Sequence, residues 1–76
     1  MKLSLAEEGK EYIISAVETE DEELDAFLFS LGCYAGEPIT VIKRRRSTCV
    51  VAIKDGRYSM DAQLTDSILV EGPNEK

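Results

Sequence analysis

The sequence predicts a mostly β domain: a small antiparallel barrel of about five strands with one α-helix inserted after the first strand. Three observations support this fold class. Short β-branched runs recur between turn residues, a single segment repeats apolar residues at the helical period, and 76 residues are too few for two separate cores. We therefore expect one domain over residues 1–71 and a flexible tail over residues 72–76, which has nothing to bury.

The first strand is predicted over residues 12–17, a β-branched apolar run too short for an independent helix. A helix should begin next, because Thr19 and Glu22 have the spacing of a capping box, in which each side chain bonds the other residue's amide. Four apolar residues then follow at helical spacing and predict one buried stripe: Leu24, Phe27, Leu28 and Leu31. Gly32 stands where a left-handed C-terminal cap is expected.

The second half of the chain is rich in strand and turn signals. Gly36 allows a tight turn into the next strand, which begins with a proline, and Asp55-Gly56 is a strong hairpin signal. The segment 61–66 is typical of a turn or a single helical turn. Four strands are predicted here: 38–42, 48–53, 57–60 and 67–71. A strongly bent sheet of the SH3-like kind accommodates these elements and removes exposed edges.

The composition excludes several classes of function. The net charge of −6 and the pI near 4.5 oppose an autonomous nucleic-acid binder, which needs cations to displace counterions from phosphates. The absence of histidine excludes Ser/His/Asp and Cys/His nucleophiles and the common zinc sites. No constellation suggests an enzyme or a cofactor. Because no apolar run approaches a membrane span and the N-terminus turns acidic early, we expect a cytoplasmic protein without membrane insertion.

The two cysteines are far apart in the sequence. Cys33 and Cys49 form no C-x-x-C pair, so the simplest interpretation is two small buried apolar side chains in a reducing compartment. A disulfide or a metal site is the alternative interpretation.

Charge is distributed unevenly along the chain. Residues 1–37 hold ten acidic and two basic side chains, whereas residues 38–76 hold five acidic and seven basic ones. The acidic run 18–25 fills the start of the predicted helix, where carboxylates complement the helix dipole, although calcium or ferrous iron would also accept such ligands. The oxygen spacing of a calcium loop is absent, so we predict no metal site.

The basic run Lys43, Arg44, Arg45 and Arg46 lies between two predicted strands. It resembles a patch for nucleic acid or another anionic partner. The simpler interpretation is a solvated hairpin end or a device that deters edge pairing.

Phe29 is the helical residue that the apolar stripe does not explain. At 100° per residue it falls on the side of Glu22 and Asp25, so it should be exposed. We expect Tyr34 to lie beside it at the helix end, and the pair is a candidate partner contact. Single exposed aromatic residues also occur without a function.

Read as one unit, the segment 27–42 has the pattern L-x-x-L-G-x-x-x-G-x-x-[IV]-x-V-[IV] and resembles the FeoA family, ferrous-iron transport protein A. Met1–Ser4 with Gly9 and Tyr12–Ile14 is similar to the family's opening strand, and residues 58–70 are similar to its closing segment. The match spans about Leu3 to Glu71. It departs at residues 44–48, where family members often carry glycine or proline.

The resemblance implies an SH3-like barrel and a non-enzymatic, cytoplasmic accessory protein of bacterial ferrous-iron uptake. It implies contact with the cytosolic G-protein region of the FeoB permease. Together with the residue analysis it makes five residues candidates for that contact, in a protein expected to be a monomer: Phe29, Tyr34, Arg44, Arg45 and Arg46. The alternative function is a nucleic-acid-binding SH3-like module that uses Lys43 to Arg46, which the net charge disfavours.

Overall fold

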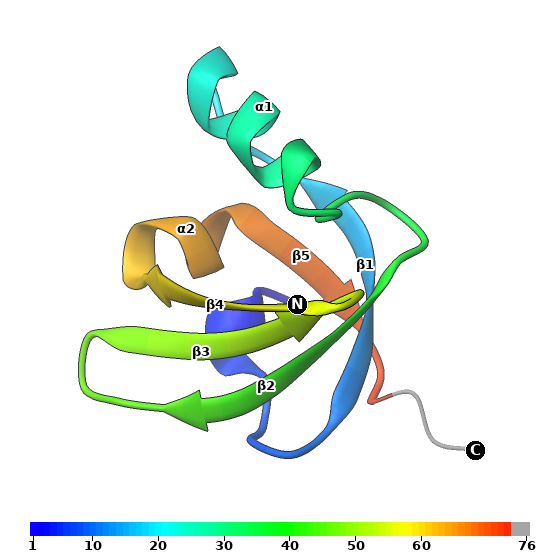
Figure 1. The fold of residues 1–76 in the computed structure, drawn as a ribbon, viewed down its shortest axis with the longest axis vertical. Coiled ribbons are helices and arrows are strands. Elements are labelled where there is room, and N and C mark those ends of the chain that lie inside the picture. The colour runs from blue at the N-terminus through cyan, green and yellow to red at the C-terminus, as the bar shows by residue number, and fades with distance from the viewer. Residues whose placement is uncertain (74–76) are drawn as a thin grey trace.

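The body of the protein is one antiparallel sheet with strand order β4-β3-β2-β1-β5 (Figure 1). The computed structural model describes residues 1–73. The strands are β1 Glu11–Val17, β2 Pro38–Arg44, β3 Thr48–Ile53, β4 Gly56–Asp61 and β5 Ile68–Glu71. Helix α1 (Glu22–Ser30) follows β1, the short helix α2 (Ala62–Ser67) joins β4 to β5, and a 3-10 turn, η1, spans Leu3–Leu5. The predicted fold class is confirmed, although within residues 1–73 no pairing of β4 with β5 closes the sheet.

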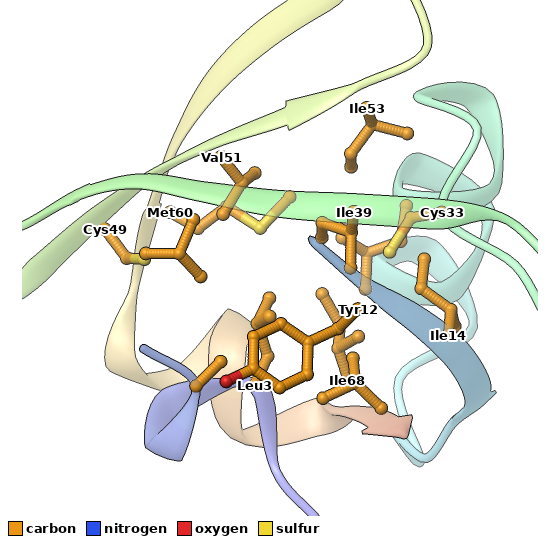
Figure 2. Close-up of a cluster of buried hydrophobic side chains, with 14 residues drawn as sticks. Leu3, Tyr12, Ile14, Cys33, Ile39, Cys49, Val51, Ile53, Met60 and Ile68 are labelled. Carbon is orange, nitrogen blue, oxygen red and sulfur yellow. The ribbon is translucent and has the colours of Figure 1, made fainter. Parts of the chain in front are cut away.

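The core lies on the concave side of the bent sheet. Strand β3 alternates in burial, so Cys49, Val51 and Ile53 face inward, as the period of two along a strand requires. Figure 2 shows Tyr12 crossing the middle of this cluster, and its hydroxyl accepts a hydrogen bond from the Glu7 amide at 3.0 Å. The described core residues are Leu3, Ala6, Tyr12, Ile14, Leu28, Cys33, Ile39, Val41, Cys49, Val51, Ile53, Met60, Ile68 and Val70.

Both cysteines are free and buried in this core, which confirms their interpretation as small apolar side chains. Burial raises the pKa of the Cys33 thiol to about 11. Burial likewise raises the pKa of Cys49. At neutral pH the reactive thiolate form is therefore scarce at either position.

The first strand, predicted over residues 12–17, is confirmed as β1, and the residues that precede it take another conformation. Leu3–Leu5 forms a 3-10 turn, and β1 begins only at Glu11. Met1 exchanges backbone hydrogen bonds with Val70, at 2.9 and 2.7 Å, and Lys2 forms a bridge with Leu69. The first residues therefore cover the free edge of β5 and place Leu3 in the core.

The N-cap of helix α1 lies two residues after Thr19, which the capping-box pattern predicts as the cap. Asp21 is the N-cap, and its Oδ1 accepts hydrogen bonds from the amides of Glu23 at 2.9 Å and Leu24 at 3.2 Å. The Thr19 hydroxyl instead accepts from the Asp21 amide at 3.2 Å. The capping box was wrong because Asp21, an equally good N-cap, satisfies the first helical amides itself.

The apolar stripe of α1 is buried only in part. Leu28 is fully buried, Leu24 and Leu31 are half-buried, and Phe27 is 51% exposed, against the prediction. Figure 1 shows α1 rising away from the sheet, with its C-terminal end nearest to the strands. The helix thus packs against the sheet by its end rather than along its length. For this reason fewer residues of the apolar stripe are buried than the periodic pattern predicts.

The predicted hairpin between β3 and β4 is present, with an antiparallel register from Ile53↔Gly56 to Thr48↔Asp61. Its two turn residues are Lys54, with φ +52°, and Asp55, so Gly56 belongs to the strand. A Cβ at Gly56 would collide with the Tyr58 ring. A side chain at position 56 would therefore have to displace the Tyr58 ring, so the glycine makes room for Tyr58 and does not form the turn.

Candidate functional site

An open groove of about 630 Å³ lies between the end of α1 and the β3–β4 hairpin. Two segments form its walls, residues 29–34 at the end of α1 and residues 53–58 of the hairpin, which are far apart in the sequence. The lining residues are Phe29, Ser30, Leu31, Gly32, Tyr34, Ile53, Lys54, Asp55, Gly56 and Tyr58. The groove combines aromatic rings with one cation and one carboxylate, and we call it the aromatic groove.

Gly32 shapes the first wall of the aromatic groove. Its φ is +94°, and its amide donates to the Phe29 carbonyl at 3.0 Å while the Cys33 amide donates to the Leu28 carbonyl at 3.0 Å. This pattern ends the helix through a left-handed residue, as predicted. The turn directs Cys33 into the core, and it leaves Tyr34 next to Phe29.

Phe29 and Tyr34 form an aromatic pair in which Phe29 is exposed and Tyr34 is half-buried. Their ring centroids are 4.9 Å apart with the planes tilted by 36°, and Phe29 is 65% exposed. The prediction that Phe29 is exposed and lies beside Tyr34 is confirmed. Because Phe29 adds nothing to the core, its apolar surface is available to another molecule.

Lys54 and Glu37, which were not predicted as site residues, hold the other side of Tyr34. The Lys54 ammonium lies 5.2 Å from the centroid of the Tyr34 ring and 3.4 Å from Glu37 Oε2. A side-chain hydrogen bond with Tyr34, and then one with Glu37, raises the pKa of Lys54. No sequence signal joins the hairpin turn to the segment after α1, so these two residues could not be found from the sequence.

The basic run is divided by the structure. The Arg44 guanidinium donates to the backbone carbonyls of Ser4 and Ala6, and to that of Leu3 at 3.4 Å, while its amide donates to Glu8 Oε2 at 2.6 Å. Arg44 therefore ties η1 to the sheet and is not a free surface cation. The Arg44 side chain, a predicted partner contact, is thus already engaged in hydrogen bonds within the protein.

Arg45 and Arg46 lie away from the aromatic groove. They are exposed and line a separate, smaller cavity of about 170 Å³, together with residues near Met60 and Thr65. The structure thus brings Phe29 and Tyr34 together, whereas the arginines border a different cavity.

The acidic run does not converge on a point. Asp21 caps α1, and Glu22, Glu23 and Asp25 occupy its first turn. Within residues 1–73, no group of three or more His, Cys, Asp or Glu side chains is placed to hold a metal ion. None of the helices in this part of the chain is long and apolar enough to cross a membrane.

We expect the protein to fold without metal and without a disulfide, because its core is apolar and its thiols are buried apart from one another. Melting curves followed by circular dichroism should be the same with and without EDTA, and with and without a reductant. A fall in Tm of more than about 4 °C with either reagent, equivalent to about 1 kcal/mol, would contradict this expectation.

A five-stranded antiparallel sheet with one inserted helix, bearing a surface groove, defines a small β domain of the SH3-like class. The FeoA domain model matches residues 1–72, so the chain belongs to the FeoA family, which is associated with bacterial ferrous-iron transport. It is accordingly a non-catalytic accessory protein, and family membership implies an iron-transport partner. A comparison with curated protein sequences gave no match.

Solved structures share this fold. FeoA of Stenotrophomonas maltophilia in complex with zinc, described as a prokaryotic SH3 domain protein, is 16% identical with a TM-score of 0.84, covering 93% of this chain and 89% of that one. Iron(II) transport protein A of Clostridium thermocellum is 27% identical with a TM-score of 0.84, covering 93% and 44%. A manganese-dependent transcriptional repressor is 18% identical with a TM-score of 0.84, but the match spans only 40% of that chain. The SH3-like prediction is confirmed.

Proposed function

We propose that this protein acts in the cytoplasm as an accessory factor of ferrous-iron uptake, by binding the cytosolic G-protein region of a FeoB-type permease through the aromatic groove. The observation that carries the proposal is the Phe29–Tyr34 pair, with Phe29 exposed, at the rim of a groove in a member of an iron-transport family. Aromatic residues are enriched among the side chains that dominate binding energy in protein interfaces.

The surroundings of the pair suit such a contact. Lys54 and Glu37 restrain Tyr34, so less conformational freedom is lost when a partner covers it. Phe29 is the most exposed aromatic ring that the groove presents, and covering its side chain would contribute about 1.5–3 kcal/mol. Residues 1–71 act as one monomeric domain in this proposal, and Arg45 and Arg46 offer a second, peripheral contact with an anionic surface of the partner.

Replacing Phe29 with alanine is expected to weaken binding to the permease's cytosolic domain by more than about 1 kcal/mol, while the free energy of unfolding stays within about 0.5 kcal/mol of wild type. The reason is that Phe29 is exposed in the free protein and becomes covered only in the complex. Calorimetric titration measures the affinity, and urea denaturation measures the stability.

Phe27→Ala is the matched control, because Phe27 lies on the same helix, is half exposed and is not part of the groove lining. It should leave affinity unchanged. Equal losses of affinity for the two variants, or no loss for Phe29→Ala, would show that the aromatic groove is not the binding surface. Failure of the wild-type protein to bind the permease domain at all would overturn the proposed partner.

A further inference from the structure

Among residues 1–73, strand β4 has one backbone edge that pairs with no other strand. The Arg45 amide donates to the Thr48 carbonyl at 2.8 Å, so Thr48 of β3 directs its backbone groups toward β2. Because antiparallel pairing alternates, Cys49, Val51 and Ile53 direct theirs toward β4. Their partners Met60, Tyr58 and Gly56 face β3 in return. The amide and carbonyl groups of Arg57 and Ser59 therefore point outward.

Nothing in residues 1–73 covers this part of the edge. No backbone or side-chain hydrogen bond of the described residues uses the outward groups of Arg57 and Ser59, and both residues are exposed. The opposite edge of the sheet, on β5, is by contrast covered by Met1 and Lys2. An uncovered edge strand is a template for another extended chain.

The free edge continues the aromatic groove. Gly56 and Tyr58 of β4 line the groove, and Phe29 stands on its other wall. A chain laid along Arg57 and Ser59 would therefore pass beside the exposed Phe29. An incoming apolar side chain could pack on Phe29 at the same time as the backbone pairs with β4.

The charges around this edge favour a basic occupant. Asp25 and Glu22 lie on the same side of α1 as Phe29, one and two turns before it, because residues four and seven apart share a helix face. The helix face that carries Phe29 therefore bears two carboxylates, and Asp55 adds a third in the groove lining. The cations of the hairpin are Arg57 and Lys54, and Lys54 is already paired with Glu37. A segment with Lys or Arg would complement this surplus.

We propose that β4 receives an extended, basic segment of the partner protein as an additional strand, paired with the backbone of Arg57 and Ser59, while an apolar side chain of that segment packs on Phe29. The inference rests on the proposed function, since the segment belongs to the protein that the aromatic groove binds. Main-chain pairing supplies affinity here, and the acidic face of α1 with the aromatic pair supplies selectivity.

The first arm of the test uses synthetic probes of about nine residues, enough to extend past the edge. One probe alternates Lys and Val, a second has Glu in place of Lys, and a third is the Lys probe with alternate amides N-methylated. The Lys probe should bind the full chain with a Kd below about 1 mM. The other two should bind at least about tenfold more weakly, because each loses either the charge match or the backbone ladder.

The second arm changes the edge itself. Ser59→Pro removes one outward amide, and a proline is tolerated on an edge strand where that amide bonds no neighbouring strand. Ser59→Thr keeps the amide and is the matched control. Ser59→Pro should weaken the Lys probe at least about tenfold and Ser59→Thr less than about twofold. Bound Lys probe should also slow hydrogen exchange at the Arg57 and Ser59 amides of the wild-type protein.

Each arm has an outcome that would overturn strand addition. The proposal is wrong if the Lys probe does not bind, if the N-methylated probe binds as well as the Lys probe, or if exchange at Arg57 and Ser59 is unchanged. Should Ser59→Pro fail to fold by circular dichroism, the N-methylated probe decides with the wild-type protein. If the permease domain binds wild type and folded Ser59→Pro equally well, strand addition fails while the proposed function stands; if it binds neither, the proposed function itself fails.

Discussion

Replacing Gly32 with valine is expected to lower the free energy of unfolding by about 3 kcal/mol, a large share of the roughly 4–11 kcal/mol available to a domain of this size. Two costs add. At φ +94° a β-branched residue is strained by about 1–2 kcal/mol. A Cβ would also lie 2.8 Å from Lys54 Cε and 3.3 Å from Ile53 Cγ2, and the buried Ile53 cannot move away freely.

Gly36→Val separates these two costs. Gly36 has nearly the same φ, +93°, but no atom lies within 4 Å of the position its Cβ would take. The Gly36→Val variant should therefore lose only the free energy of backbone strain, about 1–2 kcal/mol of stability. Urea midpoints for both variants and wild type provide the measurement. A loss below about 0.5 kcal/mol for Gly32→Val would mean that Gly32 does not need its left-handed conformation.

Replacing Arg44 with methionine is expected to cost about 2 kcal/mol of stability, although a run of consecutive basic residues suggests only a solvated surface. The guanidinium donates to the carbonyls of Leu3, Ser4 and Ala6, and hydrogen bonds with a charged partner contribute about 1.5–3 kcal/mol. Methionine keeps the apolar part of the side chain. The loss should therefore report the hydrogen bonds that hold η1 against the sheet.

Arg45→Met is the matched control, because it removes one positive charge from the neighbouring position. Arg45 is exposed, and no hydrogen bond of its side chain appears among residues 1–73, so this variant should stay within about 0.5 kcal/mol of wild type. Native-state hydrogen exchange should further show faster exchange at the Val70 amide, which bonds Met1, in Arg44→Met only. Equal stability of the two variants would show that Arg44 does not anchor the N-terminus.

The local elements of this fold follow from the sequence because their causes lie within a few residues. The β-branched runs, the apolar residue spacing and the glycine after Leu31 predict the strands, the helix and its left-handed end. The exposure of Phe29 follows from its angle on the helix, and its contact with Tyr34 follows from the short turn between them. Even here the helix start was misplaced, since Thr19 and Asp21 are both good caps.

Only the tertiary structure decides which distant residues meet. Arg44 bonds Ser4, forty residues away in the sequence, and Lys54 of the β3–β4 turn contacts Tyr34 and Glu37 in the segment before β2. Neither contact is indicated by a periodic pattern in the sequence. The exposure of Phe27 depends in the same way on how α1 leaves the sheet. Periodicity reports which side of an element is apolar, whereas the partner of that side is set by chain path and packing. The sequence by itself therefore determined the elements of this protein and the pairing of an exposed Phe29 with Tyr34, while packing decided the aromatic groove, the anchored N-terminus and the free edge of β4.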